Sequence, residues 1–531
     1  PPGSSKGSAF WLTIVAVLVC TFLAALDFSV ISTALPTIIS DLDGSDNFVW
    51  VSAAYNLASA TILPLCGQLA DVFGRRPVMF VAVTLFFIGS ALCGAARDMS
   101  WLIGARTLQG IGAGGIVGLS SIIISDLVFL AERGVYQALL SLTWALAAAI
   151  GPLIGAALTE HTSWRWIFYV NLPLAGVAMA LVIVFLKVRT PPGAMMDKLR
   201  KIDFVGNAII VIGTTLVLLA LTWGGIRYSW SDAHVVAPLV LGILIIGLFF
   251  PFEYLLQEKR IPFLEHTEPT LPVDILTNRT SVGGYIATFF HGIISISVIY
   301  YLPIFFQACQ SASPVRSSTM FFAFTFVCPF LAVVSGAVIK SMSKYRIMNY
   351  IGWALILIGL GLYTTFKEDA SPGQWIGFTI IVAAGLGIIW VSVVFPILAP
   401  IPVARSARAL AFFQFCRAFA QTWGVTISAN IVQNELKARL PAAFLAEFPG
   451  GVEIAVAAVP LVKTLPEPLR AAVRAAFAAS MARVWVAMVG FAALGALSVL
   501  LLREVPLSTG MDDTYGLATD AGRSLSSESE G

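Results

Sequence analysis

The sequence predicts an all-α polytopic membrane protein, and three observations support this fold class. Of the 531 residues, 58% are hydrophobic and only 11% are charged, whereas a soluble domain carries roughly 25% charged residues. Solid apolar runs recur along the whole chain, and a helix needs roughly 20 such residues to cross the hydrocarbon core. The runs do not show the short alternating segments that indicate a transmembrane barrel.

Fourteen of these runs are predicted to be transmembrane helices. They lie at residues 10–32, 48–70, 78–97, 101–125, 136–158, 166–186, 205–223, 235–256, 281–306, 318–339, 347–366, 374–398, 408–432 and 483–502. An even number of spans places both termini on the same side of the membrane.

Basic residues indicate which side this is. Lys and Arg gather in the loops on the side of the termini, for example Arg75 and Arg76 after the second run and Lys198, Arg200 and Lys201 after the sixth. Cytosolic loops carry the excess of positive charge in membrane proteins. We therefore expect both termini in the cytosol. We also expect the plasma membrane rather than the vacuolar membrane as the location.

The chain is predicted to contain two similar six-helix bundles. The segment that begins at Gly67 has a counterpart at Gly336, and the first and ninth runs begin a similar distance apart. These offsets predict bundles at 10–187 and 281–502, with two additional helices inserted at 188–280. The other predicted parts are a cytosolic tail at 1–9, a long outer loop at 433–482 within the second bundle and a disordered cytosolic tail at 503–531.

The outer loop allows two interpretations. It is rich in proline, and residues 467–480 carry Arg residues among apolar ones. This stretch is either a basic amphipathic helix that lies on the membrane surface or a solvated loop.

The sequence lacks the patterns that several other functions would require. The net charge of +3 is too small to indicate a nucleic-acid partner, and the six cysteines lie inside apolar runs without the spacing of a disulfide framework or a metal site. The GxGxxG pattern at 110–115 falls within a predicted span rather than after a strand. No Lys follows a Gly, so a Walker A loop is missing. We predict no cofactor, no metal and no enzymatic activity. We expect the energy for transport to come from an ion gradient or from the gradient of the solute itself.

The motifs after the second run carry a family resemblance. Residues 67–76 read GQLADVFGRR, which resembles the signature of the loop between helices 2 and 3 in the major facilitator superfamily. The Leu-Asp pair at 26–27 ahead of Ala-Leu-Pro at 34–36, and the WRWIF segment at 164–168, resemble the fourteen-helix drug:proton antiporter-2 branch. The ISDL segment at 124–127 is similar to its fungal members. The resemblance implies two six-helix bundles with two extra helices between them.

Two charged residues inside predicted spans are candidates for proton coupling. Asp27 lies deep in the first run and Arg106 lies within the fourth. A charge at mid-membrane costs about 2.5–3.5 kcal/mol on insertion scales and is retained mainly for function. The resemblance implies a coupling role for both residues. The alternatives are a permanently hydrogen-bonded Asp27 and an Arg106 that extends to the interface.

A second set of residues is predicted to latch one conformation at the cytosolic face. Runs 2 and 4 both end there, which brings their charges together, and Gly74 is suited to the positive φ of a tight turn. The resemblance implies a charge network that breaks and reforms during transport; the alternative is a solvated cluster. The predicted latch residues are Gly67, Asp71, Gly74, Arg75 and Asp126.

The remaining candidates are polar or aromatic residues within spans. Gly151, Pro152 and Gly155 form either a gate between the halves or ordinary close packing. We expect a structural His291 and a solvated Glu253, and Trp223, Trp390 and Trp423 either stack on an aromatic substrate or anchor the interface. The predicted substrate cavity comprises Tyr55, Asn56, Gln109, Gln307, Gln414, Arg417 and Gln421.

These observations predict a secondary transporter. We expect export of small organic molecules, such as drugs, toxins or secondary metabolites, by proton antiport through alternating access. The predicted partners are a small-molecule substrate, protons and the lipid bilayer, and we expect a monomer. One alternative is a fungal permease of the vacuole or plasma membrane for amino acids, siderophores or another metabolite, and a second is a sensor that does not transport.

Overall fold

The computed structural model describes residues 7–42, 49–186, 188, 194–225, 227–447, 462–463 and 465–507. Across these residues the regular secondary structure is helical, and an isolated bridge joins Gly224 and Tyr228. Most of the predicted disordered tail and the middle of the predicted outer loop lie outside the described residues.

The helices form two bundles with an inserted pair between them in sequence. The first bundle contains α1 (Ser8–Asp41), α2 (Val49–Phe73), α3 (Arg75–Gly94), α4 (Met99–Leu127), α5 (Leu130–His161), α6 (Trp166–Tyr169) and α7 (Asn171–Phe185). The linking region contains α8 (Met195–Arg200), α9 (Phe204–Trp223), α10 (Ala233–Gln257), η1 (Pro262–Leu264) and η2 (Val273–Leu276). The second bundle contains α11 (Arg279–Ala308), α12 (Pro314–Met320), α13 (Phe322–Met342), α14 (Tyr345–Tyr363), α15 (Pro372–Ser392), α16 (Val394–Leu398), η3 (Val403–Arg405), α17 (Ser406–Arg439), α18 (Ala442–Glu447), α19 (Leu469–Ser498) and η6 (Val499–Leu501).

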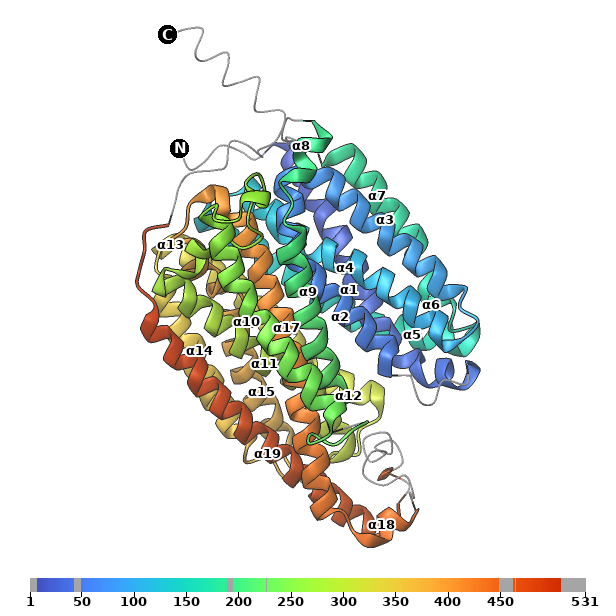
Figure 1. Cartoon of the computed structure of the whole chain (residues 1–531). Coiled ribbons are helices and arrows are strands. Elements are labelled where there is room, and N and C mark those ends of the chain that lie inside the picture. Colours follow the sequence, from blue (N-terminus) through green and yellow to red (C-terminus); the bar gives the residue numbers. More distant parts are fainter. Residues whose placement is uncertain are drawn as a thin grey trace.

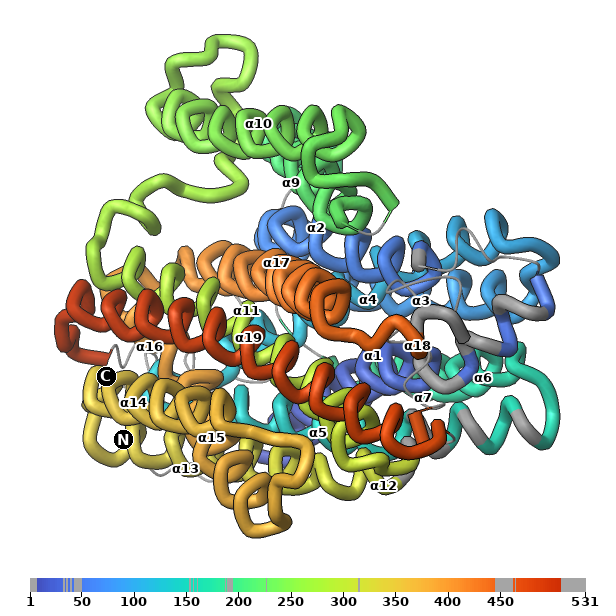
Figure 2. Tube along the Cα trace, turned by 90° about the horizontal axis from the view of Figure 1, so that it is seen from below, coloured from blue at the N-terminus to red at the C-terminus, as the bar shows by residue number. Residues whose placement is uncertain are grey.

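The two bundles lie side by side, and α1 begins at the same end of the molecule at which α19 finishes (Figure 1). We call this the terminal end and the other the opposite end. Viewed along the bundles, α9 packs beside α2 and α10 lies outside it, at the periphery (Figure 2). α9 therefore contacts both α2 of the first bundle and α17 of the second, and the direct contacts between the bundles involve mainly α2, α4, α5, α13 and α17.

Twelve helices among the described residues are long and apolar enough to cross a membrane. α2 and α17 have 25 and 34 residues, which also exceeds the roughly 20 needed to span the hydrocarbon core. Both helices are less apolar than most of the other spans. They can accommodate polar residues because α2 packs on α4, and α17 packs on α11 and α2. The full count of fourteen spans stays a prediction.

The outer surface of α10 has the apolar character of a lipid-facing helix. Its exposed side chains are Val236, Val240, Leu241, Ile243, Leu244 and Leu248. Exposed apolar side chains over several helical turns are unfavourable in water and favourable against acyl chains.

The C-terminal helix is longer than predicted. α19 begins at Leu469 and runs without a break through the predicted start of the last span at residue 483. Val473 and Phe477 are fully buried on this extension, so neither a surface helix nor a solvated loop describes it. Together with α17, which continues to Arg439, this shortens the predicted outer loop.

The expectation of a solvated Glu253 is wrong. Its side chain is 0% exposed, because the segment before η2 folds back over the end of α10 and the Leu271 amide donates to Glu253 Oε2 at 3.2 Å. Asp203 caps α9 beside it by accepting from the Gly206 amide at 2.7 Å. A Cβ at position 206 would lie 2.5 Å from Glu253 Oε1, so glycine is required for this approach.

The repeated glycines mark equivalent contacts between the bundles. A Cβ on Gly67 of α2 would lie 2.7 Å from the Ala411 Cβ of α17. A Cβ on Gly336 of α13 would lie 2.6 Å from the backbone of Gly134 in α5. Each glycine therefore allows a helix of one bundle to approach a helix of the other at the terminal end.

Replacing Gly67 with leucine is expected to destabilise the contact between the bundles, because the side chain has no space against Ala411. Overpacking of this kind costs about 1–3 kcal/mol. A lower unfolding temperature of the detergent-solubilised protein would reveal the loss. Gly247→Leu is the matched control, since nothing lies within 4 Å of a Cβ at that position. Equal unfolding temperatures for the two variants would contradict the close contact.

Candidate functional site

Asp27 and Arg106 form a buried ion pair in the first bundle. Arg106 Nη1 lies 2.7 Å from Asp27 Oδ2, and the two side chains are 1% and 2% exposed. α1 contributes the carboxylate and α4 the guanidinium. The structure thus joins the two residues predicted for proton coupling, which lie far apart in sequence.

Two amides complete the hydrogen bonding of Asp27. Gln109 Nε2 and Asn171 Nδ2 each donate to Asp27 Oδ1 at 2.8 Å. Gln109 also accepts from Arg106 Nη1 at 2.6 Å, and its amide donates to Ser90 Oγ at 2.8 Å. We call Asp27, Ser90, Arg106, Gln109 and Asn171 the carboxylate network. It connects α1, α3, α4 and α7 in one cluster.

Arg106 is held on its remaining sides by α2. Its Nε donates to the Val51 carbonyl at 3.1 Å, and its guanidinium carbon lies 4.1 Å from the ring centre of Tyr55. A cation over an aromatic face is stabilised by about 0.5–2 kcal/mol, more where water is excluded. Tyr55 and Gln109, which are predicted to line the substrate cavity, are buried beside the ion pair in this conformation.

Asp71, Arg75 and Asp126 meet at the terminal end. Arg75 lies 2.7 Å from Asp126 and 3.2 Å from Asp71. Gly74, with φ of 91°, makes the turn from α2 to α3 that positions Arg75, a backbone conformation that favours glycine. These side chains are at least 90% buried, so the cluster is not simply a solvated group of charges.

Two ion pairs join the bundles at this end. Asp71 of α2 lies 3.0 Å from Arg408 of α17, and Glu132 of α5 lies 2.9 Å from Lys340 of α13. We call these two pairs the inter-bundle pairs. Arg408 and Glu132 were not among the predicted latch residues. Each lies near the start of a helix, and the sequence does not show which charge on another helix it would meet. The offset that matches Gly67 with Gly336 also matches Asp71 with Lys340, and this was the signal available in the sequence.

Arg408 also binds the segment that follows the inserted helices. It donates to the Pro269 carbonyl at 2.9 Å and pairs with Glu268. Burial alone would raise the pKa of Glu268, but the hydrogen bonds and charges of Arg408 and Lys201 outweigh it and hold that pKa below its usual value. Glu268 therefore stays ionised, and its pair with Arg408 persists, at neutral pH.

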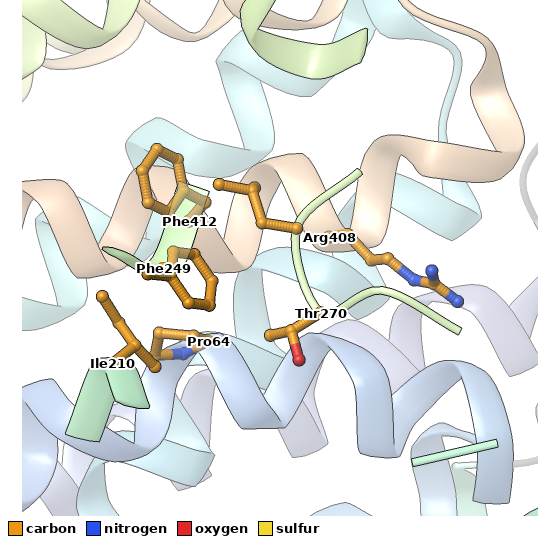
Figure 3. A pocket seen from close by; sticks show the side chains of 7 residues that line it. Pro64, Ile210, Phe249, Thr270, Arg408 and Phe412 are labelled. Carbon is orange, nitrogen blue, oxygen red and sulfur yellow. The ribbon is translucent and has the colours of Figure 1, made fainter. Parts of the chain in front are cut away.

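A small pocket lies beside Arg408. Figure 3 shows the rings of Phe249 and Phe412 close to Pro64, while the guanidinium of Arg408 points away from them. The other lining residues are Ile210, Thr270 and Leu271. The lining comes from the inserted helices, α2 and α17, and it is too tightly packed to hold a substrate.

The remaining candidates lie in different surroundings. Gln414 donates to Ser121 Oγ of α4 across the bundle interface at 2.6 Å, and Asn56, Gln307 and Gln421 are partly exposed. Arg417 donates to the Trp390 carbonyl at 3.1 Å. The predicted cavity residues therefore come from both bundles.

Gly151 of α5 packs within the first bundle. A Cβ on Gly151 would overlap the side chain of Ser29 on α1, and Ser29 Oγ donates to the Ala147 carbonyl at 3.0 Å. Gly155 is buried. The side chain of Pro152 lies outside the described residues. This placement corresponds to close packing of α5 on α1.

Two helical bundles with a buried ion pair and a charged interface define a membrane transport protein of the secondary-carrier type. The chain belongs to the Major Facilitator Superfamily: the family model matches residues 17–425. Among solved structures, the proton:xylose symporter XylE is similar with a TM-score of 0.59, at 14% sequence identity, over 93% of this chain and 95% of that one. The human organic anion transporter MFSD10 is similar with a TM-score of 0.58 at 14% identity, over 94% and 100%.

Curated relatives match nearly the full chain. Efflux pump FUS6 of Gibberella fujikuroi is 36% identical over 100% of this chain and 95% of its own length. The MFS-type efflux pump LUC4 of a Fusarium species is 36% identical over 99% and 94%. The MFS-type efflux pump MMF1 of Pseudozyma antarctica is 36% identical over 95% and 93%.

Proposed function

We propose that this protein exports small organic molecules in exchange for protons, by alternating access of the two bundles. The relatives that match its full length are named efflux pumps, which supports the direction of transport. The observation that carries the coupling is the carboxylate network, in which Asp27 is the one carboxylate and is held by Arg106, Gln109 and Asn171.

The network suggests how proton binding is linked to helix movement. A carboxylate out of water strongly disfavours its charged form unless it is paired. The ion pair with Arg106 offsets the cost of burying the Asp27 carboxylate. We propose that α1 and α4 separate within the first bundle when the bundles change conformation, and that a proton on Asp27 then replaces the lost pairing.

The conformation fits one half of this cycle. Both inter-bundle pairs found among the described residues close the terminal end. With cytosolic termini in the plasma membrane, as the distribution of basic residues favours, this is the state closed to the cytosol. Release of substrate to the outside would occur from it, and breaking the inter-bundle pairs would return the protein to the cytosol-open state.

Reconstitution tests the proposal directly. Purified protein in liposomes is given ethidium or the fluorescent acid pyrenebutyrate at equal concentrations on both sides, and a pH gradient is then imposed. We expect net movement of at least one probe against its own gradient, in the direction opposite to proton flow, and its loss with a protonophore. Concentrations of both probes that stay equal after the pH gradient is imposed would contradict antiport.

A further inference from the structure

A second buried arginine lies in the other bundle without a carboxylate partner. Arg417 of α17 is 7% exposed. Its guanidinium carbon lies 4.3 Å from the ring centre of Trp390 and 4.4 Å from that of Phe413. Its one hydrogen bond among the described residues goes from Nη2 to the Trp390 carbonyl at 3.1 Å.

A comparison with Arg106 shows which hydrogen-bond partners Arg417 lacks among the described residues. Arg106 has a carboxylate at 2.7 Å, an amide oxygen and a carbonyl. Arg417 Nε is enclosed and has no hydrogen-bond partner, and no Asp or Glu of the described chain forms an ion pair with it. A guanidinium stays charged, and an uncompensated buried charge is among the most costly arrangements in a protein. An anion supplied from outside the chain would relieve this cost.

Unused hydrogen-bonding capacity gathers around the same tryptophan. His291 Nε2 lies 3.1 Å from the Leu386 carbonyl, so in the neutral ring this nitrogen carries the hydrogen and Nδ1 is an acceptor. Nδ1 is enclosed and has no partner. The His291 ring lies edge-on to Trp390, 5.6 Å between centres. An unmatched donor on Arg417 and an unmatched acceptor on His291 thus flank Trp390.

The side chain of Arg417 contacts the second bundle and lies on the face of α17 that meets the first bundle. Gln414, one turn earlier on α17, bonds across the interface to Ser121, and Gln421, one turn later, is partly exposed. Residues at this spacing share a helix face. Trp390 is also partly exposed although it lies within α15. This face of α17 therefore looks toward the space in which a transported molecule would sit.

We propose that Arg417, with Trp390 and Phe413 on its two faces, binds the carboxylate of a planar, largely apolar organic acid carried by this protein. The aromatic rings cover the faces of the guanidinium. Nε is enclosed and Nη2 donates to the Trp390 carbonyl, so Nη1 is the nitrogen left for the ligand. The apolar part of such a molecule packs on Trp390. The inference rests on the proposed transport function and specifies a substrate class for it.

Binding of a matched pair of probes tests the site. Pyrenebutyrate and pyrenebutanol share a planar apolar body and differ in the carboxylate, and energy transfer from tryptophan to pyrene reports their binding to the full-length protein in nanodiscs. A hydrogen bond to a charged group is worth roughly 1.5–3 kcal/mol. We expect the wild type to bind the acid about ten- to hundredfold more tightly than the alcohol.

The variants assign this preference to Arg417. Arg417→Gln is expected to bind both probes with equal affinity, and Arg417→Lys to keep a reduced preference because it keeps the charge but loses the planar group that stacks between the two rings. The control is Arg474→Gln, since Arg474 also donates only to carbonyls, those of Cys309 and Glu368. If Arg417→Gln does not fold, Arg417→Lys alone decides, because a preference equal to that of the wild type would overturn the requirement for a guanidinium.

The outcomes separate this site from the transport proposal. A wild type without preference for the acid, or an Arg417→Gln variant that keeps it, overturns the anion site even if proton-driven export is found. Acid-selective binding that depends on Arg417, in a protein that moves no probe uphill, supports the site and counts against export.

Discussion

Replacing Asp27 with asparagine is expected to abolish uphill transport while leaving downhill exchange of the same probe. A proton that crosses 100 mV gains about 2.3 kcal/mol, and one pH unit adds about 1.36 kcal/mol. One proton per uncharged molecule can therefore sustain a concentration ratio of about 500. Exchange of one proton for the cation ethidium moves no net charge, so one pH unit alone sustains a ratio of about 10. A carrier that no longer binds the proton reaches a ratio of about 1. The measurement is the steady-state ratio of the probe across proteoliposomes under an imposed gradient.

The structural effect of this substitution must be separated from the loss of coupling. Asp27 accepts from Arg106, Gln109 and Asn171, and an asparagine places one donor among these donors. Asp27→Glu keeps a titratable group, so this variant is expected to retain part of the steady-state concentration ratio of the probe. Asp98→Asn is the chemical control, because Asp98 caps α4 by accepting from the Trp101 amide at 2.8 Å and asparagine caps a helix equally well. Full uphill transport by Asp27→Asn would eliminate Asp27 as the coupling residue.

Removal of Arg408 is expected to open the terminal end. Arg408 joins Asp71 of α2, the Pro269 carbonyl and Glu268, so glutamine at this position leaves two carboxylates without their shared cation. Removal of one partner from a wholly buried ion pair destabilises a protein by about 3–5 kcal/mol. The Arg408 side chain is 11% exposed, so we expect a loss of about 2–3 kcal/mol, which shifts the equilibrium between the closed and open states about 30- to 150-fold.

Hydrogen exchange of the backbone amides measures this opening. Arg408→Gln is expected to accelerate exchange at the ends of α2 and α17 that face each other near Gly67 and Ala411. Arg439→Gln is the control, because Arg439 forms an exposed pair with Glu435 at the other end of α17, where ion pairs contribute little. Exchange that is unchanged in Arg408→Gln would show that the inter-bundle pairs do not hold this state.

The sequence predicts most helices well because apolar runs of sufficient length have few alternatives in a membrane. The fourth run, predicted at 101–125, is α4 from Met99 to Leu127. The prediction of the start of α19 is wrong because residues 469–482 mix Arg with Ala and Val. Hydropathy alone does not distinguish such a segment from a surface helix, and only packing of its buried face identifies it as part of the bundle.

The candidate site shows the same limit. The insertion cost of a charge singles out Asp27, Arg106 and Arg417 in the sequence. Whether each has a partner depends on helices far apart in the chain: Arg106 has Asp27, whereas Arg417 has aromatic rings and a carbonyl. The burial of Glu253 could not be predicted for a related reason. The residue that covers it, Leu271, lies in the loop after α10, and the sequence does not show that this loop folds back over the helix.

The polarity of the two inter-bundle pairs favours one mode of assembly. Two repeated halves with similar interface geometry are also suited to associate with copies of themselves. Here the first half contributes both anions, Asp71 and Glu132, and the second contributes both cations, Arg408 and Lys340. An encounter between two first halves, or between two second halves, would bring like charges together at both contacts. Electrostatics therefore selects the hetero-association of unlike halves during folding and opposes promiscuous self-pairing of nascent bundles.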